Sequence, residues 1–214
     1  MKLRYQLLTL SSALIFIGCG GGGSDSVDTA NSDTASSAGA SSGSVTITTP
    51  NPFPAELLSE ETITAYLKVI NAARAAGQDC GSQGQKSAAP AVTWSEALYG
   101  AAMEHSTDMA VSNTFAHSGS GTSSDWTGID YGKQSTSQER TENNGYQDWK
   151  TIGENLTAGT DRDTAQEAIN AWIESDSHCA ILMNPEYTEV GMALVYEVDS
   201  KLDYYWTQNF GALR

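Results

Sequence analysis

Apolar residues recur at helical spacing in three stretches of the chain and predict three helices. The first follows Ser59 and ends at Gly77, with acidic residues in its first turn, where they stabilise the positive end of a helix. The second begins at Ser95, and the third runs from about residue 163 to residue 173. The apolar stripes are Ile63, Tyr66, Leu67, Ile70 and Ala73; Leu98, Ala102, His105 and Met109; and Ala165, Ala168, Ile169, Trp172 and Ile173.

After residue 185 the pattern changes to alternation, which is typical of a strand buried on one face. The alternating residues are Val190, Met192, Leu194, Tyr196 and Val198. The segment DSKLD then predicts a turn, and YYWTQNF predicts a second strand that completes an antiparallel hairpin. Helices followed by strands, without regular alternation of the two, favour an α+β fold.

The N-terminal part of the chain has the layout of an export signal and a tether. Residues 1–18 carry two basic residues and then an apolar run, which is typical of a bacterial signal peptide. The sequence FIGC resembles a lipobox and implies that Cys19 becomes the lipidated first residue, with an ordinary signal peptide or an uncleaved anchor as the alternative. Residues 19–54 are rich in Gly, Ser and Thr and predict a flexible tether, so one folded domain is expected over residues 55–214. This layout predicts an extracytoplasmic lipoprotein of the outer membrane or cell surface, or a secreted protein.

The chain is strongly acidic. Its formal net charge is −15, and removal of Lys2 and Arg4 with the signal peptide leaves nine basic against 26 acidic residues, a net charge of −17. Nucleic-acid binding needs a cationic surface, and an anionic membrane would repel this domain. The charge therefore excludes nucleic acid as a partner and leaves the lipid anchor as the expected contact with the membrane.

Three cysteines remain to be assigned. If Cys19 carries lipid, Cys80 and Cys179 are left as a pair in an oxidising compartment, which predicts a disulfide between them. Neighbouring residues on a helix or strand project in different directions, so Cys179 is not expected to aim its sulfur at the ring of His178. We interpret these two neighbours as having separate roles, one structural and one at a site.

His117, Glu154 and His178 are the candidate site residues. Each is expected on a separate loop or at the end of an element, where a scaffold can bring distant side chains together in a cleft. Imidazoles and a carboxylate suit a borderline divalent ion such as zinc, and a His–Glu pair can also act as a general base on water. The sequence has no HExxH motif, and Ser118 is interpreted as a loop residue and not as a nucleophile.

Four motifs in a fixed order carry a family resemblance. HSTDMAVSNTFAHSG, GENL, SHCAILMNPEYTEVG and YWTQNFG resemble the bacterial branch of the CAP superfamily, the cysteine-rich secretory, antigen 5 and pathogenesis-related proteins with an SCP-like domain. The resemblance covers roughly residues 60–212. It implies a three-layer α-β-α sandwich of the CAP type, with an antiparallel sheet and a large open cleft.

The resemblance also implies a tetrad of two histidines and two acidic residues that can hold a divalent metal. Three of its positions match His117, Glu154 and His178. The fourth, an acid three residues after the helix tryptophan in many relatives, is Ser175 here. Glu174 is the preferred substitute, because it would share a helix side with His178 if the helix continued; Asp176 or a three-membered site are the alternatives.

Several other tempting residues are interpreted as structural. His105 lies on an apolar helical stripe and is expected to be a hydrogen-bonded core histidine, and Glu189 is expected to be a surface acid at a strand end. The aromatic residues expected in the core are Trp172, Tyr187, Tyr205 and Trp206.

Two functions from different classes follow from these observations. The first is a non-catalytic binding or interaction module, a tethered CAP domain whose cleft binds a metal, a small apolar ligand or a peptide. The alternative is a metal-dependent, peptidase-like hydrolase of the cell envelope that uses His117, Glu154 and His178. We favour the first, because a resemblance of this kind defines a fold better than it defines a reaction.

Overall fold

The computed structural model describes residues 57–214. The predicted signal peptide, the lipidation site at Cys19, the whole predicted tether and the first two residues of the predicted domain lie outside the described residues. Between residues 57 and 214, no helix combines the length and the apolar character needed to cross a membrane.

A four-stranded sheet forms the middle layer. In order across the sheet, its strands are β3 (Thr93–Trp94), β5 (Glu189–Tyr196), β6 (Tyr204–Leu213) and β4 (Trp149–Gly159). The predicted C-terminal hairpin is confirmed as β5 and β6, and β4 pairs with β6 in antiparallel orientation. Only the short strand β3 runs parallel to its neighbour β5. Strand β6 is therefore central, and β4 forms one edge.

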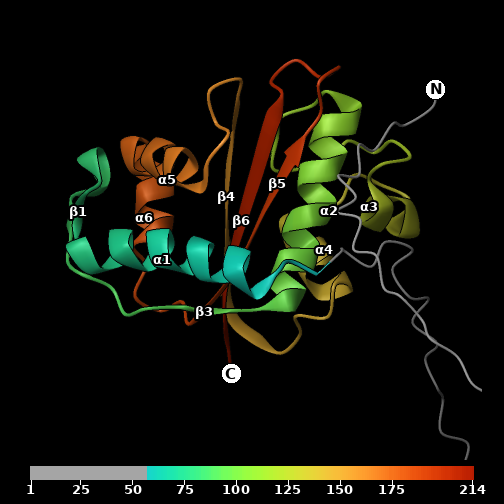
Figure 1. Cartoon of the computed structure of the whole chain (residues 1–214). Helices are drawn as coiled ribbons and strands as arrows, with labels where there is room; N and C mark the ends of the chain where they lie inside the picture. The colour runs from blue at the N-terminus through green and yellow to red at the C-terminus, as the bar shows by residue number, and fades with distance from the viewer. Residues whose placement is uncertain (1–56) are drawn as a thin grey trace, which may run out of the picture. The chain divides into compact units, whose positions relative to one another are not determined.

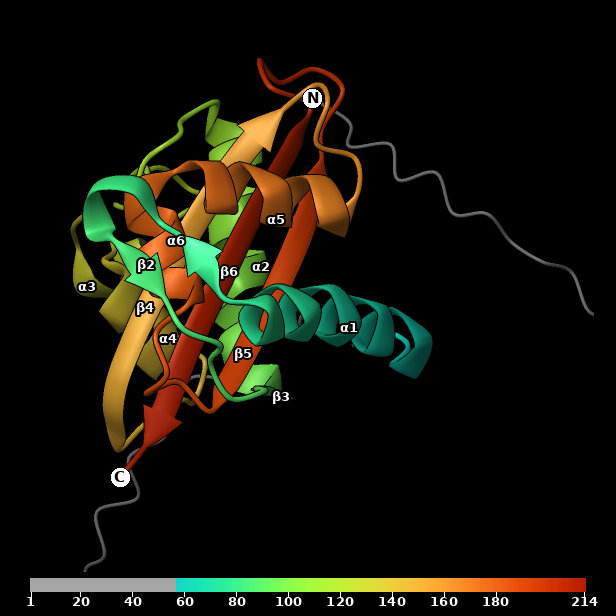
Figure 2. The same ribbon diagram turned by 90° about the vertical axis from the view of Figure 1, so that its left-hand side faces the viewer.

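Helices cover both faces of this sheet (Figure 1). One layer contains α1 (Glu60–Ala76), α5 (Ala165–Glu174) and α6 (Asp176–Leu182), and the other contains α2 (Glu96–Ser112), α3 (Trp126–Tyr131) and α4 (Ser137–Asn143). Figure 2 shows the first layer in front of the sheet and α2 behind it. The predicted α+β fold, a three-layer α-β-α sandwich, is thus confirmed, with a sheet that is antiparallel except at β3.

The alternating strand residues give each face of the sheet its own core. Val190, Met192 and Phe210 pack with α1, α5 and α6, whereas Ala193 and Tyr205 belong to clusters that include buried residues of α2. Burying an apolar side chain of this size stabilises a fold by about 1.5–3 kcal/mol, so both helical layers are held by the sheet. The four aromatic residues predicted in the core are all buried: Trp172, Tyr187, Tyr205 and Trp206.

The predicted helix ends are confirmed by their capping contacts. The hydroxyls of Ser59 and Ser95 each accept a hydrogen bond from the backbone N–H three residues on, and α1 ends at Gly77 with a φ of 68°. The third predicted helix is α5, which begins with a capping box between Thr164 and Glu167. These contacts satisfy backbone groups that a helix terminus leaves unpaired.

Among the elements that the local pattern missed are three helices and one long strand: α3, α4, α6 and β4. Strands β5 and β6 are buried on both faces, so the expectation that β5 is buried on one face was wrong. Strand β4 was missed because polar residues, Glu154, Asn155 and Thr157, occupy its buried positions and no apolar alternation results. Consequently Glu154 lies in the middle of a strand and His178 lies within α6, and the expectation that both sit on loops or element ends was wrong. The first strand of the hairpin ends at Tyr196, two residues before its predicted end.

Candidate functional site

The loop between α2 and α3 carries His117, and two buried carboxylates hold this loop. Asp108 accepts hydrogen bonds from the backbone N–H of Ser120 at 2.7 Å and from the hydroxyl of Ser124 at 2.6 Å. Asp125 accepts three from backbone N–H groups, each at 3.0 Å. Burial opposes ionisation of Asp125, but its hydrogen bonds lower its pKa below the ordinary value. The backbone around His117 is therefore fixed from within the fold.

Glu154 lies on the face of β4 that α2 covers, and both of its carboxylate oxygens have a partner. Oε1 accepts a hydrogen bond from Nδ1 of His117, and Oε2 accepts one from Nη2 of Arg140, each at 2.9 Å. Only 3% of the Glu154 side chain is exposed, against 58% of His117. Burial alone would raise the pKa of Glu154, but the charge of Arg140 and the hydrogen bond from His117 lower it to about 2. Glu154 is therefore ionised at neutral pH.

The bond to Glu154 also sets the tautomer of His117. An ionised carboxylate can only accept, so Nδ1 of His117 carries the hydrogen. In the neutral ring, Nε2 then has a free lone pair, which can accept a hydrogen bond or a proton. The half-exposed edge of His117 is thus prepared to meet a ligand.

Arg140 is a site residue that the sequence did not reveal. Its side chain is buried; Nη2 also donates to the backbone oxygen of His117 at 2.9 Å, and Nη1 donates to the hydroxyl of Ser135 at 2.9 Å. It lies in the polar stretch SQERTENN, which has no periodic pattern to suggest burial. Arg140 holds His117 at two points, directly through its backbone and indirectly through Glu154.

His178 approaches from the opposite helical layer. The centroids of the His117 and His178 rings are 6.4 Å apart, with an angle of 52° between the ring planes. The side chain of Asn155 in β4 donates to the backbone oxygen of His178 at 3.2 Å. Burial, and then the nearby His117, lower the pKa of His178. The two imidazoles therefore meet at the edge strand β4, and His178 favours its neutral form.

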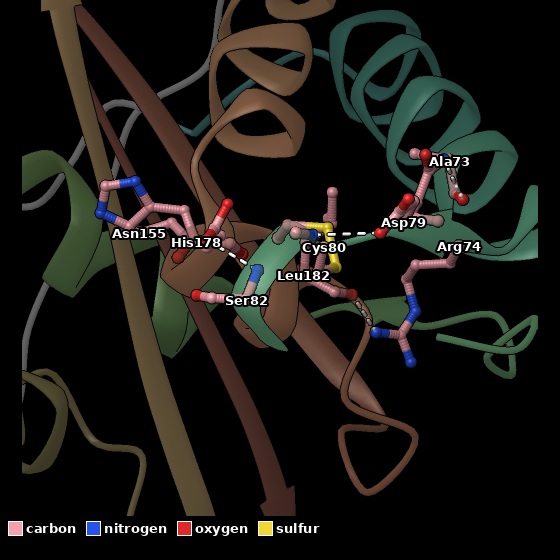
Figure 3. The surroundings of a disulfide bond; sticks show 12 residues. Ala73, Arg74, Asp79, Cys80, Ser82, Asn155, His178 and Leu182 are labelled. Atoms are coloured by element: carbon pink, nitrogen blue, oxygen red, sulfur yellow. Dashed lines mark hydrogen bonds between the residues drawn. A yellow bond between two sulfur atoms is a disulfide. The ribbon is translucent and has the colours of Figure 1, made fainter. Parts of the chain in front are cut away.

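Cys179 faces away from this site. It forms a buried disulfide with Cys80, with their Cα atoms 5.4 Å apart, and Figure 3 shows the His178 ring pointing away from the two sulfur atoms. The predicted disulfide and the separate roles of the two neighbours are confirmed. The disulfide joins α6 to Cys80, which directly precedes the short 3-10 turn Gly81–Gln83. This turn lies between the short paired strands β1 (Gln78–Asp79) and β2 (Gln85–Lys86).

Neither of the two acids proposed as the fourth site member has a hydrogen bond to the site histidines in the described residues. Helix α5 ends at Glu174, because Ser175 adopts an extended conformation (φ −101°, ψ 116°) before α6 begins. The continuous helix that would have placed exposed Glu174 beside His178 is therefore absent, and that premise was wrong. Asp176 instead accepts a hydrogen bond from the backbone N–H of Ser82 at 2.8 Å, which ties α6 to the 3-10 turn.

The side chains around the histidines do not fit the metal tetrad that the family resemblance implies. Within residues 57–214, no group of three or more His, Cys, Asp or Glu side chains is arranged to hold a metal ion. The expected ligand set was His117, Glu154, Glu174 and His178. Both oxygens of its central acid are already engaged, one of them by a guanidinium. Of the three residues that lie together, His117 and Glu154 are hydrogen-bonded, and the ring of His178 lies beside that of His117.

A hollow of about 420 Å³ lies beside the loop that carries His117. Two of its lining residues, Ser120 and Gly121, lie three and four residues after His117 in the same loop. Three glycines, one exposed isoleucine and one lysine are among its lining residues, so its wall offers both polar and apolar groups. The lining residues are Ser120, Gly121, Gly128, Ile129, Gly132, Lys133 and Gln134.

His105 lies behind the cluster, and its interpretation as a core histidine is confirmed only in part. It is fully buried, and its Nε2 donates to the backbone oxygen of Ala116 at 2.9 Å, but Nδ1 has no partner among the described residues. Burial, followed by the charge of Arg140, lowers the pKa of His105 to about 4, so the ring is neutral. Glu189, expected at the surface, is half-buried and accepts a hydrogen bond from the hydroxyl of Tyr146 at 2.7 Å.

Comparison with known protein families agrees with this fold. Residues 67–210, more than half of the chain, match the CAP family, described as the cysteine-rich secretory protein family. The chain belongs to the CAP family.

Individual relatives are more distant. The chain is 34% identical over 62 residues to the uncharacterized protein YkwD of Bacillus subtilis strain 168, a match that spans 29% of this chain and only 21% of YkwD. Its fold is similar to an extracellular protein containing a SCP domain from Bacillus anthracis str. Ames (TM-score 0.50, 20% identity, 73% of this chain and 44% of that chain). It is also similar to an outer surface protein from Borrelia burgdorferi (TM-score 0.53, 17% identity, 74% of this chain and 97% of that chain). At these identities the two structures show a common fold.

Proposed function

We propose that this CAP-domain protein is an extracytoplasmic, non-catalytic binding module that captures a peptide or a small, partly apolar ligand. The binding site is the His117–His178 pair together with the hollow beside the His117 loop. The observation that carries the proposal is the fixed, half-exposed ring of His117. Glu154, which is buried, ionised and paired with Arg140, orients this ring.

The chemistry of the two rings indicates the polar part of the ligand. Nε2 of His117 can accept a hydrogen bond when the ring carries no proton there, and burial lowers the pKa of His178 and so favours its neutral form. An imidazole nitrogen with a free lone pair suits the N–H or O–H groups of a peptide or hydroxylated ligand. Within residues 57–214, no serine, threonine or cysteine side chain hydrogen-bonds to either ring, so neither histidine has a hydroxyl or thiol nucleophile to activate.

The second candidate is a hydrolase of the cell envelope. The observation in its favour is the bond between Glu154 and Nδ1 of His117, because a carboxylate that orients an imidazole is the usual arrangement of a general base acting on water. The metal-dependent form of this hydrolase needs more ligands than the cluster offers, so water activation would fall to His117.

Replacing both histidines by alanine is expected to weaken binding of a peptide by at least about tenfold, because two hydrogen-bond partners are lost. A peptide library and a panel of small apolar ligands are screened for binding by wild type, and the hits are titrated against His117→Ala/His178→Ala. The same peptides and a pool of esters are assayed for hydrolysis. Unchanged affinity in the double variant would reject the proposed site.

The control and the enzyme test use the same material. Glu174→Gln alters an exposed acid near α6 and is expected to leave the affinity unchanged. Hydrolysis by wild type that disappears in the double histidine variant would establish the enzyme and reject the binding module. Binding without turnover is the result expected here.

We also propose that Cys19 carries a lipid that tethers the domain to a membrane. The support is the sequence FIGC after an apolar run, followed by a segment too poor in apolar residues to form a core. Cells grown with a fatty-acid analogue are expected to label the wild-type protein, and labelling is expected to fall to background in Cys19→Ala. Equal labelling of the two proteins would exclude the anchor.

A further inference from the structure

Glu154 matches an acid of the metal tetrad that the family resemblance implies, yet the positive charge of Arg140 already balances its negative charge. We infer that Arg140 is a positioning residue that takes the place of a metal ion at this site, so that the His117–His178 pair is built to work without a divalent metal. The inference concerns the site of the proposed function and does not depend on the ligand proposed for it.

The contacts of Arg140 are those of a fixed cation at the centre of the cluster. A single nitrogen, Nη2, lies 2.9 Å from Oε2 of Glu154 and 2.9 Å from the backbone oxygen of His117. The other terminal nitrogen is anchored to Ser135, and the side chain is almost fully buried. A guanidinium with several fixed hydrogen bonds loses little freedom for each bond formed, so the carboxylate and the loop are held together.

The charge of Arg140 acts against a second cation. For a metal to ligate Glu154, it would have to displace either His117 or Arg140 from a buried carboxylate, and displacing Arg140 leaves an uncompensated buried charge. If the ion binds without displacing it, the divalent ion and the guanidinium repel each other, which at about 6 Å and an effective dielectric constant of about 20 reduces the affinity by at least about a hundredfold.

No second acid compensates for this repulsion. The corresponding tetrad position is Ser175, and Asp176 is engaged with the backbone of Ser82. Two imidazoles are left as ligands, which is fewer than a stable zinc site provides.

Zinc binding by the full chain, purified in detergent, tests the inference by titration calorimetry at neutral pH. Arg140→Met removes the cation and frees Oε2 of Glu154, so it is expected to bind zinc at least about tenfold more tightly than wild type. Arg140→Lys keeps the positive charge but loses the paired N–H donors of the guanidinium, and its zinc affinity is expected to stay within about threefold of wild type. Lys68→Met removes an exposed positive charge from α1, outside the proposed binding site, and is expected to change nothing.

The comparison of the two Arg140 variants separates charge from structure. If Arg140 were merely structural, Arg140→Lys and Arg140→Met would change the zinc affinity alike, and the inference would be overturned. Wild type that binds zinc as tightly as Arg140→Met would overturn it as well.

A second measurement does not depend on whether Arg140→Met folds. Wild-type crystals grown with zinc are examined by anomalous scattering at the zinc edge. A zinc ion bound by Glu154 or by the two imidazoles would overturn the inference, whereas the absence of zinc at the cluster supports it. Neither measurement uses a peptide ligand, so a failed ligand screen and a failed zinc test remain distinguishable.

Discussion

Replacing Arg74 by methionine is expected to lower the free energy of unfolding by about 3–5 kcal/mol. The Arg74 side chain is fully buried in α1, and its guanidinium lies 5.8 Å from the ring centroid of Phe210. Its nitrogens donate to the backbone oxygens of Pro90 (2.9 Å), Leu182 (2.6 Å), Asn184 (3.2 Å) and Tyr187 (3.4 Å). Methionine keeps the apolar volume but leaves these carbonyls, several of them buried, without a donor.

Urea denaturation of the two proteins measures this loss. Lys68→Met removes an exposed positive charge from the same helix and is expected to change the unfolding free energy by less than about 0.5 kcal/mol. Arg74→Lys is expected to fall between them, because a single ammonium cannot reach carbonyls on both sides. A loss below about 1 kcal/mol in Arg74→Met would mean that water replaces the missing donors.

Removing the disulfide with Cys80→Ala/Cys179→Ala is expected to lower the free energy of unfolding by about 4 kcal/mol. The bond joins residues 99 positions apart, and cross-linking over such a distance restricts the unfolded chain strongly. Loss of the disulfide also removes an anchor of α6, the helix that carries His178. This helix has seven residues and no side-chain N-cap. We therefore expect ligand binding at the histidine pair to weaken together with stability.

Chemical denaturation of the oxidised wild type and the double alanine variant measures the stability difference. Wild type treated with a reductant is expected to match the variant, and Ser177→Ala, an exposed change in the same helix, is expected to match oxidised wild type. Stability retained after loss of the bond would show that packing of α6 against β4 and α5 suffices to hold it.

The elements that the sequence predicted correctly are those whose signals are local. Helix α1 combines an N-cap serine, an apolar stripe and a terminal glycine within one short segment. Strand β5 was recognised because the larger apolar residues Val190, Met192 and Leu194 alternate with others along one face. Strand β4 gave no such signal, since polar residues occupy its buried middle.

The sequence predicted three residues that the structure brings together, but it missed the cation that pairs with Glu154. His117, Glu154 and His178 do come together, as the resemblance implied. The missed residue is Arg140, and nothing in its neighbourhood along the chain distinguishes it from a solvated surface arginine. Arg74 left a weak signal, because it lies four residues after Ile70, on the edge of the apolar stripe of α1.

The sequence by itself determined the capped helices, the C-terminal hairpin, the pairing of Cys80 with Cys179 and the identity of the two site histidines. Only the tertiary structure decided how the charges are paired. Arg140 hydrogen-bonds to Glu154, which is 14 residues away in the sequence, and Arg74 hydrogen-bonds to the backbone of Leu182, which is 108 residues away. Helical and strand periods report which face of an element is buried, but they carry no information about which distant group lies opposite. A buried charge is stable only with such a partner, so the partner, and with it the chemistry of the site, is fixed when the layers pack.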